Sequence, residues 1–490
     1  MNTIELKEKK LDVGLFQFIF PFSLKDGSEP DVFSWLRNHD FRSFRLNQLE
    51  DETRYYGSFH VSHRDIEAYY LPFTNKLLFP HSDNEKGFHR FSKALNKPFY
   101  LETEQVNIPF DIHSLDVIIC SYQLGFLTVR TQIAESAQRT LSEAIEFASR
   151  FRVLEPRTTR DRKTKIHDGD HTYNQIENFL FDQLLPGITV YFDWENSKGS
   201  YFETFPFFED ERMYVQALIS LNEEEEITYP DIYRTVGLTG INQAGKPFVG
   251  ANNLEYIKTY LKKHSYERWA PNTYYVMEEH CFVCITNETQ EMLPILASQM
   301  YGEFYYGLLL NLFHKIVLLT IANDYSKINI DRDTKEINKL IFTINSFTAN
   351  FFFLELATQS QGRDLFIYLR KVFKIDLLYN DTRQTLSSLF KYQENAATKK
   401  DSTLLLILTL YTVIGGIFGM NLVIDDLKGK IHWQKMLSYS PFEYIALFLA
   451  ISGLFISVFL GIQNLIQWRK EKKEKKRWMS ETIISGKKQP

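Results

Sequence analysis

The hydrophobic and polar positions of this 490-residue chain follow different patterns in its N-terminal, middle and C-terminal parts. Up to about residue 133, segments either alternate apolar with polar residues or are rich in β-branched and aromatic residues, as in GLFQFIFPF at residues 14–22. Both patterns are typical of β-strands. They predict strands at residues 14–22, 43–49, 54–63 and 66–73, and a pair of strands that meet near residues 122–125.

Helical spacing begins after this strand-rich part. Leu141, Ile145 and Ala148 lie on one face of a predicted helix at residues 134–151, whereas the polar and charged stretch at residues 155–171 predicts an exposed loop. From residue 290 onward the pattern predicts long helices. The sequence therefore indicates an α+β domain followed by a helical region.

One of the later helices is as apolar as a membrane span. Residues 305–322 carry Asn311, His314 and Lys315 at their centre, where a charged group costs roughly 2.5–3.5 kcal/mol in a bilayer. We therefore predict a buried helix of the soluble domain here, with a third membrane span as the alternative.

Two further runs lack charged residues over about the 20 positions that a hydrocarbon core of roughly 30 Å requires. Seven lysines and arginines between Arg469 and Arg477 should hold the C-terminus in the cytoplasm. Two spans then return the N-terminal part to the same side, so we expect a multi-pass protein of the cell (plasma) membrane with both termini cytoplasmic. In chain order, we predict a cytoplasmic α/β domain at 1–289, a helical stalk region at 290–401, transmembrane helices at 402–422 and 442–466 with an extracellular loop at 423–441 between them, and a basic cytoplasmic tail at 467–490.

Composition agrees with this arrangement. The mean hydropathy of −0.26 indicates that most of the chain is exposed to water. The net charge of −5 includes the strongly basic tail, so the rest of the chain is distinctly acidic and nucleic acid is not expected as a partner. Three cysteines cannot build a disulfide framework, which favours a reducing compartment.

The first apolar run carries small and polar residues on one side of its helix. Steps of three and four residues place them, with the residues that extend the row inward, in a single stripe. Such a stripe suits close packing between helices, to which Gly415 and Gly419 would contribute as a GxxxG pair, or a water-filled axis within a symmetric oligomer. The pore-lining positions predicted by the second interpretation are Thr398, Asp401, Leu405, Thr409, Thr412 and Gly416.

The tripeptide GMN, Gly419, Met420 and Asn421, follows this run directly and precedes a second apolar run and a basic tail. In this position, and within TVIGGIFGMN, it resembles the CorA magnesium transporters. The resemblance implies a CorA-like funnel: a homopentamer whose first transmembrane helix lines the pore and whose Gly419, Met420 and Asn421 form the selectivity filter. A ring of neutral amide groups would hold hydrated Mg²⁺ through its water shell, because this ion gives up water reluctantly.

The family resemblance also implies roles for acidic residues. Asp425 and Asp426 stand where the family has an acidic outer loop and are expected to attract cations. Intracellular Mg²⁺ is expected to bind acidic residues between subunits and to close the funnel. The acidic residues proposed for this sensing are Glu209, Asp210, Glu223, Glu224, Glu225 and Glu226. Mg²⁺ is then the transported and regulatory ion, with no other cofactor.

Other functions remain open on the same residues. The chain could carry another divalent metal, such as Zn²⁺, Co²⁺ or Ni²⁺, or it could be a non-conducting sensor or scaffold anchored in the membrane. No P-loop, nucleophile elbow or dinucleotide fingerprint is present in the sequence, so an enzyme is not expected. The HCFVC motif, with Cys281 and Cys284, is interpreted as a core strand, with half of a zinc site as the alternative.

Overall fold

The computed structural model describes residues 4–419 except 135–138, 157, 170, 194–211, 329–333 and 354. Beyond residue 436 it describes 437–445, 447–448, 451–453, 455, 458–459, 462, 466, 469 and 473. The chain divides into two compact units. The first contains Met1–Lys327 and Thr343–Thr382, and the second contains Ile328–Phe342 and Arg383–Thr482.

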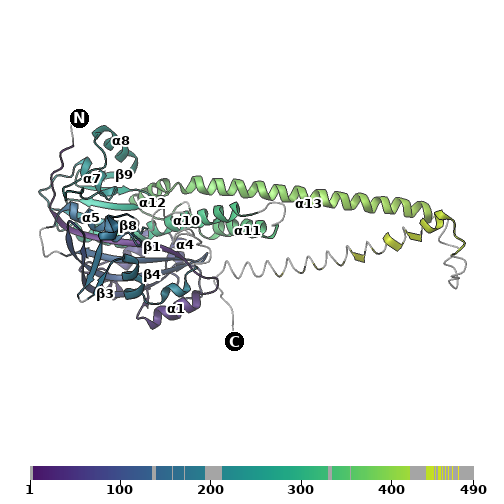
Figure 1. The fold of residues 1–490 in the computed structure, drawn as a ribbon, viewed down its shortest axis with the longest axis horizontal. Coiled ribbons are helices and arrows are strands. Elements are labelled where there is room, and N and C mark those ends of the chain that lie inside the picture. Colours follow the sequence, from purple (N-terminus) through teal and green to yellow (C-terminus); the bar gives the residue numbers. More distant parts are fainter. Residues whose placement is uncertain are drawn as a thin grey trace. The chain divides into compact units, whose positions relative to one another are not determined.

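An 11-stranded mixed sheet forms the centre of the first unit (Figure 1). Its order is β7-β6-β3-β4-β5-β1-β8-β11-β10-β9, with β2 paired to β3, and among these pairs only β8 and β11 run parallel. The strands are β1 Leu11–Ser23, β2 Arg42–Ser43, β3 His89–Glu102, β4 Asn107–Cys120, β5 Leu124–Ile133, β6 Lys165–Asp168, β7 His171–Tyr173, β8 Tyr214–Leu221, β9 Ser265–Trp269, β10 Thr273–Met277 and β11 Cys281–Thr286.

Helices accompany this sheet and continue beyond it. They are α1 Glu29–Asn38, α2 Asp51–Arg54, α3 His63–Tyr69, α4 Pro72–Leu78, α5 Leu141–Phe151, α6 Ile176–Asn178, α7 Tyr229–Val236, α8 Leu254–His264, α9 Leu293–Tyr301, α10 Glu303–Ser326, α11 Thr334–Asn350, α12 Ser360–Val372 and α13 Ile375–Gly419. Three short helical turns, η1 Asp161–Lys163, η2 Phe179–Leu184 and η3 Ile188–Tyr191, lie between β5 and β8. The predicted α+β class is confirmed.

Both faces of the sheet are covered, as the alternation along β1 illustrates. The rings of Phe16 and Phe18 contact Phe147 of α5, with centroids 5.3 and 5.8 Å apart. The intervening Gln17 points to the other face, where its Nε2 donates to the carbonyl oxygen of Met300 in α9 at 3.0 Å. Because neighbouring strand residues face opposite sides, one strand anchors helices on both faces.

Several sequence predictions in the sheet region are confirmed. The strand predicted at residues 14–22 lies within β1, and the two strands predicted to meet near residues 122–125 are β4 and β5. Tyr122 and Gln123 make the turn between them with φ values of 65° and 56°. The predicted helix at 134–151 is present as α5, which begins at Leu141 behind a Thr140–Glu143 capping box.

Other local predictions are wrong. The segment at residues 66–73, predicted as a strand, instead contains the last part of α3 and the start of α4. The strand predicted at 54–63 is replaced by a turn. The Ser62 hydroxyl accepts from the backbone N–H of Asp65 at 3.1 Å and starts α3, while Pro72 starts α4. These start signals outweigh the strand-like aromatic pattern. The strand predicted at 43–49 is reduced to β2, and the loop predicted at 155–171 includes β6, which pairs with β3.

The apolar helix at residues 305–322 is buried within the first unit, as predicted. It belongs to α10, where Asn311, His314 and Lys315 are all at most 7% exposed. Burial lowers the pKa of His314 to about 3, and its Nε2 lies 2.7 Å from the carbonyl oxygen of Phe351. The Lys315 ammonium lies 3.5 Å from a carboxylate oxygen of Glu279. These polar groups therefore have partners inside the domain.

Candidate functional site

The stripe predicted to line a pore lies on α13, a single helix of 45 residues (Figure 1). Its first turn is fixed to the first unit: the Arg370 guanidinium lies 2.6 Å from the Asp376 carboxylate, and the rings of Phe352 and Tyr379 stack at 4.1 Å. At 1.5 Å per residue the helix extends about 68 Å. No proline interrupts it, and Leu410 continues the helix through the middle of the apolar run.

The stripe residues are exposed along this helix. Thr398, Asp401, Thr409 and Thr412 are exposed, and Leu405 is 63% exposed. The three threonine hydroxyls donate to the carbonyl oxygens four residues earlier at 2.7–2.8 Å. Each hydroxyl thus has a partner for its O–H group within the helix. Its oxygen can still accept a hydrogen bond from water through its lone pairs.

Backbone is also accessible at the end of the stripe. An added Cβ at Gly416 would meet nothing within 4 Å. Gly419 is the last residue of α13. The stripe therefore combines hydroxyls, a carboxylate and bare backbone on one side of an otherwise apolar helix.

A second apolar helical stretch, which includes residues 451–453, packs against α13. A Cβ placed on Gly453 would lie 3.4 Å from Cδ1 of Tyr411. At 100° per residue, Tyr411 lies 200° around the helix from Thr409. Among the described residues, this contact is therefore on another side of α13 and leaves the stripe open.

The apolar side chains of both stretches are exposed in the single chain. Leu406 and Leu410 are 67% and 57% exposed, and Phe448 and Phe455 are 70% and 74% exposed. Contiguous apolar surface of this kind marks contact with lipid or with another protein. These exposed apolar side chains are therefore candidates for such a contact.

The remaining predicted site residues are placed as follows. Met420, Asn421, Asp425 and Asp426 lie outside the described residues, as do Glu209 and Asp210. Glu223, Glu224 and Glu226 are exposed directly after β8. Within the described part of the chain, no group of three or more His, Cys, Asp or Glu residues is arranged to hold a metal ion.

Glu225 has a structural partner instead. Its carboxylate lies 3.6 Å from the Lys9 ammonium, and its carbonyl oxygen accepts from the Asn287 side chain at 2.9 Å. Among the predicted sensing residues that the structure describes, Glu223, Glu224, Glu225 and Glu226 thus lie together in one segment after β8.

The HCFVC motif forms part of the core, as its first interpretation predicted. Cys281 and Cys284 are fully buried on β11, and burial raises the pKa of both thiols. The Cys281 thiol lies 2.9 Å from the carbonyl oxygen of Val236. Cys120 is likewise buried, with a raised pKa.

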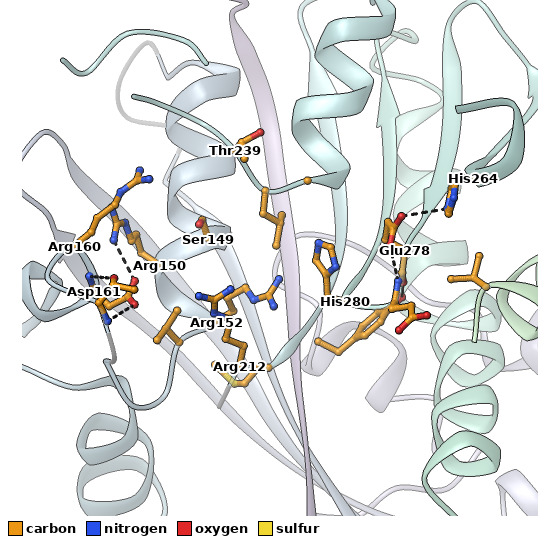
Figure 2. A pocket seen from close by; sticks show the side chains of 18 of the residues that line it. Ser149, Arg150, Arg152, Arg160, Asp161, Arg212, Thr239, His264, Glu278 and His280 are labelled. Carbon is orange, nitrogen blue, oxygen red and sulfur yellow. Dashed lines mark hydrogen bonds and ion pairs between the residues drawn. The ribbon is translucent and has the colours of Figure 1, made fainter. Parts of the chain in front are cut away.

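A basic cleft in the first unit was not predicted from the sequence. It encloses about 970 Å³ and is lined by residues from the ends of α5, α8 and α12 and the starts of β8 and β11 (Figure 2). Its residues lie in short segments that are far apart in the chain and share no motif. The one sequence signal was the density of arginine and lysine at residues 150–163.

By length and composition, one helical stretch among the described residues, Leu293–Ser326, could cross a membrane, and 89% of its apolar window is buried inside the protein; Asp401–Val413 is a shorter apolar helix. Comparison with known proteins gives no match to a family model, a curated protein or a solved structure.

Proposed function

We propose that this protein is a channel-like transporter in which several copies assemble around the stripe of α13 and let divalent cations, Mg²⁺ above all, pass through a membrane. The observation that carries the proposal is the exposed row of hydroxyls and bare backbone on an otherwise apolar helix. It lies on a different side from the contact between Tyr411 and Gly453. A row left open by the hairpin partner is available to an axis shared by several copies.

The dimensions of α13 support this assignment. Residues 402–419 form 18 positions of helix, about 27 Å in length, which is close to the roughly 30 Å of a hydrocarbon core. The second apolar stretch brings the chain back across. Two helices cannot enclose a water-filled path, so a ring of copies is needed, and cyclic symmetry would place the same stripe on every wall.

The ion preference rests on the resemblance to the CorA transporters at Gly419, Met420 and Asn421. In this proposal, an amide ring at Asn421 holds Mg²⁺ with its water shell at the outer mouth. Asp425 and Asp426 raise the local cation concentration outside it. At the inner end, Asp401 would supply a ring of carboxylates where α13 enters the membrane.

Cysteine accessibility tests whether the stripe faces water. We would compare Thr409→Cys with Ile407→Cys, which lies 160° around the helix at a depth only about 3 Å different. Cys120, Cys281 and Cys284 are buried, so they provide a low background. In liposomes, a charged, membrane-impermeant thiol reagent should modify the cysteine at position 409 and leave the one at position 407 unmodified.

The other outcomes are equally informative. Protection of both positions would mean that the stripe serves helix packing, and the proposal would fail. Modification of both would mean that this segment is not in the bilayer at all.

A further inference from the structure

The helices α7 and α8 carry tyrosines whose rings contact one another. The two helices pack side by side and cover the part of the sheet that contains β10 and β11 (Figure 1). Tyr233 of α7 lies between two tyrosines of α8, with its ring centroid 6.3 Å from that of Tyr256 and 5.1 Å from that of Tyr260. Tyr256 is 54% exposed, and Tyr229, one turn before Tyr233, is 39% exposed. We call these four residues the tyrosine face.

The chemistry of this face suits contact with another protein. Each tyrosine offers a large, rigid apolar ring and a hydroxyl that can bond to water or to a partner, and such residues are enriched in the buried centres of protein interfaces. The ring of Tyr260 stacks on His264 at 4.3 Å, and its hydroxyl donates to the Glu278 carboxylate. Rings that are already held in place lose little side-chain entropy when a partner binds.

Opposite charges lie at the two ends of the tyrosine face. The acidic end consists of three exposed side chains between β8 and α7: Glu223, Glu224 and Glu226. The basic end consists of Lys262 and Lys263, which are exposed in the last turn of α8. Lys263 lines the same cleft as Tyr214, the first residue of β8. The eight residues of β8 therefore separate the two ends by about 26 Å, at roughly 3.3 Å per residue.

The two ends do not neutralise each other within one chain. Their separation of about 26 Å exceeds the Debye length of about 10 Å at 0.1 M salt. Neighbouring charges are paired, as the Lys258 ammonium is with the Glu255 carboxylate at 2.9 Å. In the part of the chain that the structure describes, the five side chains of the two ends have no ion-pair partner. They remain available to a partner outside the chain.

We propose that the tyrosine face binds the same face of a second copy of this chain. A two-fold axis through the middle of the face would place the tyrosines of both copies against each other. It would also place the acidic end of each copy over the basic end of the other. Each favourable charge contact then occurs twice, which fixes the orientation of the two copies. A membrane surface fits this face less well, because anionic lipid headgroups would repel its acidic end.

This contact is independent of the proposed transport function, because all its residues belong to the first unit. A two-fold contact joins chains in pairs and does not by itself close a ring of several copies. In the proposed transporter it would therefore connect a chain of one ring to a chain of another ring.

Disulfide cross-linking tests the proposal, because residues near a two-fold axis lie close to their own copies. We would oxidise full-length Tyr256→Cys protein in detergent with copper phenanthroline and measure the covalent dimer on a non-reducing gel. The matched control is Tyr100→Cys, since Tyr100 is 48% exposed but lies in β3, which β4, β5 and β1 separate from β8. Cys120, Cys281 and Cys284 are buried and give a low background. The first variant should form dimer at least about tenfold faster than the control, because the contact raises the local concentration of the thiols.

Charge reversal tests whether the two ends meet. On the Tyr256→Cys background, Glu223→Lys with Glu224→Lys should slow cross-linking about tenfold, because like charges then face each other across the contact. Lys262→Glu with Lys263→Glu should slow it by a similar factor for the same reason. All four changes together restore opposite charges, so the rate should return to within about twofold of the starting rate. These four side chains are exposed, so their replacement leaves the core intact.

Two results would overturn the proposal. Equal cross-linking at positions 256 and 100 would mean that the tyrosine face does not meet its own copy and serves a different partner. Failure of the four combined changes to restore the rate would mean that the acidic and basic ends do not meet. Neither measurement depends on ion flux, so failure of this contact can be distinguished from failure of the proposed transport.

Discussion

Asp116 offers the sharpest test of how the sheet domain is held together. This β4 carboxylate is fully buried between two guanidiniums: Arg90 Nε lies 3.0 Å from its Oδ2, and Arg130 of β5 pairs with the same oxygen. Arg90 and Arg130 are themselves at most 3% exposed. The replacement Asp116→Asn keeps the shape of the side chain but leaves two buried cations without their anion.

The expected cost follows from the remaining contacts. Loss of one partner from a buried ion pair costs about 3–5 kcal/mol. Asp116 has two cationic partners, but we expect the cost to stay within this range because both guanidiniums keep other hydrogen bonds. Arg90 still donates to the Tyr306 hydroxyl at 2.7 Å, and Arg130 still donates to Gln17 at 3.0 Å. With roughly 2 cal/mol/K of unfolding entropy per residue of the first unit, the melting temperature should fall by about 4–6 °C.

Near-ultraviolet circular dichroism of the full-length protein during heating would measure this change. The matched control is Asp40→Asn, the same substitution at a carboxylate that is 89% exposed and 4.0 Å from Lys93. It should alter the melting temperature by less than about 1 °C, because exposed pairs contribute little. If Asp116→Asn also melts within about 1 °C of the unmodified protein, the argument that this carboxylate neutralises buried charge is wrong.

Three further predictions address pH, the outer mouth and control. Burial raises the pKa of Glu303 to about 7, so the folded state retains a proton that the unfolded state loses near pH 4.5, and stability falls as pH rises toward 7. Glu303→Gln should therefore raise the melting temperature more at pH 8 than at pH 5. An equal effect at both pH values would contradict the raised pKa. Replacing Asp425 and Asp426 by Asn should weaken the apparent affinity for Mg²⁺ at low ionic strength but not at physiological salt, where their field is screened over roughly 8 Å; an unchanged concentration dependence at low salt would count against their role. Hydrogen exchange in residues 382–400 should be slower in millimolar Mg²⁺ than in chelator if the ion stabilises a closed ring, and identical exchange would remove the proposed sensing.

Local patterns predicted those elements whose environment is set by neighbours in the sequence. β1 and the β4–β5 pair were found because β-branched and aromatic residues extend over many positions. The helix α5 was found because Leu141, Ile145 and Ala148 recur at helical spacing, although its start at the Thr140–Glu143 cap was placed too early. The buried state of α10 followed from the polar residues at its centre. The helices α3 and α4 were missed because aromatic residues, which favour strands, outnumber the few start signals.

Long-range pairing accounts for what the sequence did not disclose. The position of β1 between β5 and β8, and the parallel pairing of β8 with β11, join segments that are about 100 residues or more apart or are separated by helices. The basic cleft depends on these pairings, since Arg152 meets Arg212 through the bridge at Val153. The stripe on α13 could be predicted because all its residues belong to one helix.

Flux of Mg²⁺ into proteoliposomes tests the central claim most directly. The purified protein should admit Mg²⁺ down its gradient, reported by an enclosed Mg²⁺-sensitive dye, and an inside-negative potential should increase the rate because each charge gains about 2.3 kcal/mol per 100 mV. Asn421→Ala should abolish uptake while leaving the oligomer intact on a sizing column, and Zn²⁺, Co²⁺ and Ni²⁺ in parallel assays would reveal a different preference. Absence of flux through the unmodified protein, or Mg²⁺ uptake unchanged by Asn421→Ala, would contradict the account and favour a non-conducting membrane scaffold.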